Sequence, residues 1–128
     1  MAQVLDLFGR QVGPAQAKPG YRAFEVSDRP EADLFLVFSD QNRYLILRYA
    51  DLESIGSSPG EDCNRVVMLR FHGSVKRDVR IEGRRLMELV DHLRWHKVPW
   101  IEETRKRWTP YGDDNVSVSR ITVKEIKH

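Results

Sequence analysis

Apolar residues change their spacing in the second half of this chain. From Val75 to Ile81 they favour alternate positions, the period of a strand with one buried face. After Gly83 the interval lengthens to three or four residues, which is typical of an amphipathic helix. The apolar stripe of that helix consists of Leu86, Leu89, Val90 and Leu93. The sequence therefore predicts a strand over 75–81, a turn at Gly83 and a main helix over 83–97.

Shorter apolar runs divide the rest of the chain. Their residue types predict strands over 21–26, 33–38, 43–49, 65–71 and 116–126. The run 33–38 is expected to be a central strand buried on both faces, joined to 43–49 by a hairpin at 39–42. Residues 10–20 and 56–62, rich in glycine, proline and serine, are expected to be loops. The alternation changes phase between Val118 and Ile121, which indicates a bulge in the last strand.

Pro99 is expected to break or kink the main helix at Val98. Beyond it, Glu102 and Lys106 are four positions apart, as are Glu103 and Arg107, in the order that supports a helix. The sequence therefore predicts a second helical piece over 99–108.

The elements together predict a single α+β domain over 1–128. Its five to seven strands form an antiparallel meander, which one principal helix in the C-terminal half covers. Over about residues 33–96 this element order loosely resembles the pleckstrin-homology-like fold. The resemblance is one of element order and carries no functional assignment.

Composition fits a soluble globular protein, with 41% hydrophobic and 31% charged residues. The single cysteine, Cys63, excludes an internal disulfide and fits a reducing compartment. The longest apolar run is far shorter than a membrane span, and the first residues lack the basic leader of a signal peptide. We expect a cytoplasmic protein of a bacterial type, with no membrane span.

No motif for catalysis, phosphate binding or calcium binding is present, so no catalytic residue, metal or cofactor is assigned. His92 and His96 are four apart and could share one helix face, but two ligands make an incomplete metal site. Acidic neighbours make Cys63 a poor nucleophile, because they raise the pKa of a thiol. Whether His72, His92, His96 or Cys63 has a chemical role stays open.

Trp95 is the unusual residue of the helix. On an ideal helix it points away from the apolar stripe, among Arg84, Glu88 and Asp91. An exposed tryptophan on a charged face indicates a contact surface. Three other interpretations remain: the helix ends early, a terminal segment covers the ring, or Arg84 stacks on it.

Positive charge is concentrated in the second half: residues 1–64 carry a net charge of −4 and residues 65–128 a net charge of +6. The leading hypothesis is a small non-catalytic module that contacts a protein, or a second copy of itself as a homodimer. Its predicted interaction surface comprises Trp95, Arg84, Arg94, Lys97, Arg105, Lys106, Arg107 and Trp108.

Two alternatives stay open. The mixture of basic and aromatic residues also suits nucleic acid binding, although Glu102 and Glu103 would lower the local potential. A small-ligand binder or enzyme would instead use a pocket between sheet and helix, with His72, His92, Arg48 or Asp91.

Overall fold

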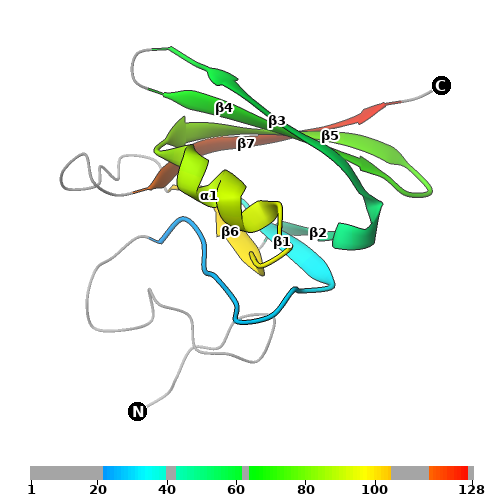
Figure 1. Cartoon of the computed structure of the whole chain (residues 1–128). Coiled ribbons are helices and arrows are strands. Elements are labelled where there is room, and N and C mark those ends of the chain that lie inside the picture. The colour runs from blue at the N-terminus through cyan, green and yellow to red at the C-terminus, as the bar shows by residue number, and fades with distance from the viewer. Residues whose placement is uncertain (1–21, 40–42, 62–63, 105–115, 127–128) are drawn as a thin grey trace.

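The computed structural model describes residues 22–39, 43–61, 64–104 and 116–126. These residues form an α+β fold with two sheets and one α-helix (Figure 1). The strands are β1 (Asp33–Val37), β2 (Tyr44–Arg48), β3 (Leu52–Pro59), β4 (Arg65–His72), β5 (Lys76–Arg84), β6 (Trp100–Glu102) and β7 (Ser117–Ile126). The helix is α1 (Leu86–Leu93), and a short 3-10 turn, η2 (Tyr49–Asp51), joins β2 to β3. The expected 10–20 loop lies outside the described residues.

The larger sheet has the order β3-β4-β5-β7, and all its neighbours are antiparallel. The predicted alternation is confirmed for Val79 and Ile81, which are fully buried while Arg80 is exposed, but Val75, expected on the same buried face, is exposed and precedes β5. The bulge predicted in the last strand is also confirmed. Glu82 of β5 is opposite Arg120 and Gly83 is opposite Val118, so β7 has one extra residue at Ser119.

The smaller sheet has the order β2-β1-β6, with β1 central as predicted. Leu34 and Leu36 are fully buried, whereas the alternate residues of β1 are only half-buried, so the expectation of two equally buried faces was wrong. The expected strand 21–26 is reduced to one isolated bridge between Phe24 and Ile101. The hairpin prediction is supported by the antiparallel register of Val37 with Tyr44.

The prediction of a second helical piece over 99–108 was wrong at its start, where the chain forms the strand β6. Trp100 to Glu102 pair in parallel with β1, and Ile101 is fully buried. Two buried apolar side chains after Pro99 favour an extended segment, and this tertiary pairing outweighs the local charge pairs that suggested a helix. Residues 105–108 lie outside the described residues.

The main helix is shorter than the predicted 83–97. At its start, Gly83 is still part of β5, and Arg85 enters the helix in the left-handed region with φ 58°. At its end, the His96 N–H donates to the Leu93 carbonyl (2.9 Å) and the Lys97 N–H to the His92 carbonyl (3.0 Å). With His96 at φ 59°, these bonds form a Schellman motif. The segment 94–97 therefore closes the helix instead of extending it.

A second correction concerns residues 56–62, which were expected to form a surface loop. Residues up to Pro59 belong to β3, which pairs with β4 from Leu52 opposite Phe71 to Pro59 opposite Arg65. The glycine and serine content of this segment is typical of loops, but pairing with β4 supplies the hydrogen bonds that hold it extended. The second half of the expected loop is the β3–β4 connection.

One core joins all the elements. The smaller sheet and α1 lie on the same side of the larger sheet, as Figure 1 shows. Their buried side chains form one cluster that includes Leu36, Leu47, Leu69, Ile81, Leu89 and Ile101. No described element covers the other face of the larger sheet in Figure 1. None of the helices among the described residues is long and apolar enough to cross a membrane.

Tyr49 ties the corner between the two sheets to the end of the helix. It is 2% exposed, its hydroxyl donates to the Val98 carbonyl (2.6 Å), and its ring stacks on His96 with centroids 4.6 Å apart. Burial raises the pKa of the Tyr49 hydroxyl, because an ionised phenolate would lose its hydration there.

Tyr49→Phe is expected to lower the free energy of unfolding by about 1–3 kcal/mol, because it leaves the buried Val98 carbonyl without its donor. The raised pKa also makes wild-type stability fall once pH rises above about 10, the unfolded-state value, since only the unfolded chain ionises readily there. Urea unfolding at neutral and alkaline pH measures both effects. The prediction fails if Tyr49→Phe and the wild type have equal stability at neutral pH, or the same alkaline loss.

Candidate interaction surface

Trp95 is 61% exposed and is among the exposed large apolar residues of the described chain. It lies in the turn directly after α1, where the Schellman motif fixes the backbone. The guanidinium of Arg94 lies over its ring, 5.1 Å from the centroid. Stacking by arginine was therefore a sound alternative, but Arg94 and not Arg84 lies there. A cation over an indole holds the ring in place without covering it.

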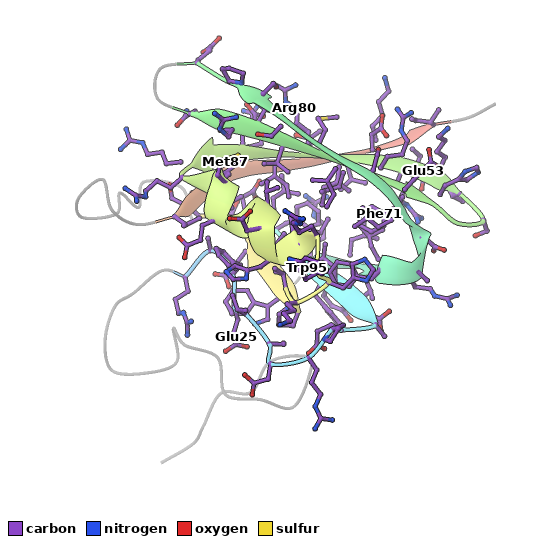
Figure 2. The ribbon with its side chains drawn as sticks, viewed as in Figure 1. Glu25, Glu53, Phe71, Arg80, Met87 and Trp95 are labelled. Atoms are coloured by element: carbon purple, nitrogen blue, oxygen red, sulfur yellow. The ribbon has the colours of Figure 1, made fainter. Side chains whose placement is uncertain are left out.

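Four more exposed side chains accompany Trp95. We call Met87, Glu88, Asp91, Arg94 and Trp95 together the α1 ridge. Met87, Glu88 and Asp91 lie on the helix away from its buried residues, and Arg94 and Trp95 lie in the turn that follows. Figure 2 shows the labelled Met87 and Trp95 at opposite ends of the helix, and Met87 is 46% exposed. The α1 ridge thus carries two apolar side chains, two acidic groups and one basic group.

The α1 ridge adjoins β3, which is an edge strand of the larger sheet. The Ser57 hydroxyl donates to the Met87 sulfur (3.5 Å) and accepts from Nη1 of Arg65 (2.9 Å). Six of the eight residues of β3 are exposed. The helix and the strand edge therefore form one continuous surface around Ser57.

Two other predicted surface residues, Arg84 and Lys97, lie at opposite ends of the helix. Arg84 ends β5 before the helix begins, whereas Lys97 follows the helix at its opposite end. The Lys97 carbonyl accepts from the Ser27 N–H (2.8 Å), which fixes the N-terminal segment against this turn. Arg105, Lys106, Arg107 and Trp108 lie outside the described residues.

The histidines in the described part of the chain have separate surroundings. His72 Nδ1 is 3.1 Å from Oε2 of Glu53, His92 packs against Phe24, and His96 stacks on Tyr49. His92 and His96 do not share a helix face, because the helix ends between them. Within the described ranges, no group of three or more His, Cys, Asp or Glu residues could hold a metal ion. Cys63 lies outside those ranges.

The uncovered face of the larger sheet has its own charge pattern. Arg70 of β4 and Asp78 of β5 form two hydrogen bonds, of 2.7 and 2.9 Å, and the guanidinium lowers the pKa of the Asp78 carboxyl. Nε of Arg80 is 3.4 Å from the Glu82 carboxylate. Arg120 and Lys124 of β7 are exposed and lie opposite Glu82 and Asp78 in the strand register. On this uncovered face, the basic residues of β5 and β7 outnumber their acidic residues.

Two hollows lie on this same face. One, of about 210 Å³, is lined by Ser54, Gly56, Met68, Arg70 and Asp78, among others. The other, of about 510 Å³, lies near the β3–β4 connection and includes Ser58, Asn64, Arg80 and Arg120. Neither involves His72, His92, Arg48 or Asp91, the residues expected to line a pocket between sheet and helix.

Sequence reasoning missed β3, and with it the edge beside the α1 ridge. The segment has one large apolar residue in its centre, Ile55, which is half-buried opposite Leu69. The apolar pattern of 65–71 could have indicated this missing strand, because a strand that is so strongly apolar needs a neighbouring strand on each side. Comparison of the chain with protein-family models, with curated proteins and with solved structures found no match in any of the three.

Proposed function

We propose that this protein is a small non-catalytic interaction module of a bacterial-type cytoplasm whose α1 ridge contacts a protein. The observation that carries the proposal is the 61% exposure of Trp95. Leaving a tryptophan in water forgoes apolar burial, and such residues are enriched among those that dominate binding energy. The Schellman turn and Arg94 limit the freedom of the ring, so little conformational entropy is lost when a partner covers it.

The charges of the α1 ridge support a partner that is itself a folded protein. Asp91 and Arg94 lie between the two apolar side chains, so the surface combines exposed apolar groups with charges of both signs. Aromatic residues, methionine and arginine are enriched in contacts between proteins. The partner is another protein or a second copy of this chain.

Trp95→Ala is expected to weaken association at least about tenfold, the effect of losing a central aromatic side chain. The melting temperature should change by only a few degrees, because the ring adds little to the core. Sedimentation equilibrium over a range of protein concentrations, together with thermal unfolding, measures both.

Trp100→Ala is the matched control. Trp100 is 9% exposed, so its truncation should cost about 3–5 kcal/mol of stability. The proposal is contradicted if Trp95→Ala destabilises the fold as much as Trp100→Ala, or if association is unchanged.

Nucleic acid binding is the second candidate, and the uncovered face of the larger sheet favours it. The exposed Arg120 and Lys124 extend the basic surface beyond the pairs Arg70–Asp78 and Arg80–Glu82. Phosphate contacts depend strongly on salt. A fluorescence titration with single-stranded DNA at low salt separates the candidates: no binding at micromolar protein removes this one.

The pleckstrin-homology-like order belongs to the proposal as well. It is supported by the succession of β1 to β5 before α1. In this chain these strands are divided between two sheets, and β6 lies beside β1.

A further inference from the structure

We infer that β3 is a self-association edge: two copies of the chain join antiparallel through Ser54–Ser58, so that their larger sheets become one continuous sheet. This inference rests on the proposed function, because it identifies the partner as a second copy, and it adds a surface that the α1 ridge does not include. It is based on three features of β3: the middle of this edge strand has no charge or proline that would prevent pairing, Gly56 lies in open space, and the residues on either side of Gly56 can pair with those of a second copy.

β3 lacks, over most of its length, the features that normally protect an edge strand. Proteins prevent edge pairing with lysines, prolines, bulges or short strands. Here the protective features stand only at the two ends of β3: a register irregularity between Leu52 and Ser54, and Pro59 as the last residue. Between them Ser54 to Ser58 carries no charge, and four of its five residues are exposed. The unprotected part is thus bounded on both sides.

Gly56 provides the second argument. A glycine inside a strand is destabilising and often marks a place where another backbone approaches closely. No close contact within the described residues calls for it, because a Cβ at Gly56 would meet no atom within 4 Å there. Gly83 is the opposite case, since a Cβ there would collide with the Ser117 carbonyl oxygen. Gly56 therefore leaves open space at the middle of the exposed edge.

The sequence around Gly56 suits pairing with itself. A two-fold axis at Gly56 would place Ser54 opposite Ser58 of the second copy and Ile55 opposite its Ser57. Directly opposed residues of such a pair lie on the same face, so both sheets keep their apolar faces on the same side. No charge is brought opposite a like charge within this span.

The α1 ridge enlarges the same interface. The contact of Ser57 with Met87 places α1 beside β3, on the apolar side of the larger sheet. The two-fold axis therefore brings the two helices to opposite sides of the strand seam, antiparallel to each other. Each ridge carries the acidic residues Glu88 and Asp91 and the basic Arg94, so an antiparallel copy is able to bring opposite charges together. Strand pairing and helix contact together bury more area than either surface alone, toward the ~1,200 Å² of a stable interface.

Gly56→Lys is the direct test. The open space at Gly56 admits the side chain in the single chain, whereas two copies would oppose two like charges at the axis. We expect the dissociation constant to rise about 100-fold or more while the melting temperature of dilute protein is kept. Thr122→Lys, at an exposed position of β7, adds the same charge away from β3 and should leave association unchanged.

Hydrogen exchange provides an independent readout. In the wild type, amides within 54–58 should become more protected as protein concentration rises, and this gain should be absent in Gly56→Lys. The inference is overturned if the chain remains monomeric at every concentration. This holds even if a strand from a different protein pairs with β3. An unchanged dissociation constant in Gly56→Lys also overturns the inference.

The variants separate this inference from the proposed function. If Gly56→Lys abolishes association and Trp95→Ala does not, pairing through β3 is supported and the proposed role of Trp95 is contradicted. If Trp95→Ala weakens association and Gly56→Lys does not, contact through the α1 ridge is supported and pairing through β3 is contradicted.

Discussion

Gly83→Ala should destabilise the fold by more than about 3 kcal/mol, enough to unfold much of the population of a marginal domain. A Cβ at Gly83 would collide with the Ser117 carbonyl oxygen and lie 3.0 Å from Cα of Val118. Both obstacles are backbone atoms of β7, held in place by its pairing with β5. The clash can therefore be removed only if the paired backbones of β5 and β7 move apart, because no flexible side chain is available to move instead.

Gly56→Ala is the matched control for this substitution. It changes the same residue type within a strand of the same sheet, but its Cβ meets no atom within 4 Å. We expect a change between zero and a gain of about 1 kcal/mol. Urea unfolding of both variants at low protein concentration measures the contrast. Equal stability of the two variants would show that the approach of β7 to Gly83 is not the constraint described.

Glu103→Ala should cost about 2–4 kcal/mol, because one carboxylate joins the two sheets. Its Oε1 accepts from the Ser39 N–H at the end of β1 (2.9 Å), and its Oε2 accepts from the Ile121 N–H in β7 (2.7 Å). Alanine leaves two part-buried backbone donors without their acceptors, at about 1–3 kcal/mol each before water replaces part of the loss. Chemical denaturation measures the effect.

Glu103→Gln makes the test sharper. An amide has one oxygen, so it can accept from Ser39 or from Ile121 but presents an N–H₂ group to the other donor. We expect a loss of about half that of alanine or more. Glu125→Ala, which removes an exposed partner of Arg77 at 3.4 Å, should change stability by less than about 0.5 kcal/mol. The prediction fails if Glu103→Ala is no more destabilising than Glu125→Ala.

Local patterns predicted the elements that local patterns stabilise. The strand predicted over 75–81, the apolar stripe of the helix and the bulge near Val118 are all read from the spacing of apolar residues. The structure has all three, with the strand at Lys76–Arg84. The helix ends were predicted less well. The chain adopts positive φ at Arg85 and His96, residue types that give no sign of such a backbone, and the Tyr49 ring that stacks on His96 is distant in sequence.

Elements that depend on distant partners were missed. β6 has three residues, and its strand conformation follows from its position beside β1 and Phe24, more than 60 residues earlier. β3 has the composition of a loop and is held by β4. For the candidate site, the sequence predicted the outward direction of Trp95 but not its arginine neighbour or the strand edge beside it.

The parallel pairing of β1 with β6 determines when the smaller sheet can be completed. β3, β4 and β5 pair with neighbours in sequence, so their hairpins close short loops and can form early. β1 must wait for a strand that leaves the ribosome only after α1 has been synthesised. Until then Leu34 and Leu36 have no strand on one side, and we expect the nascent chain to be most prone to chaperone capture during that interval.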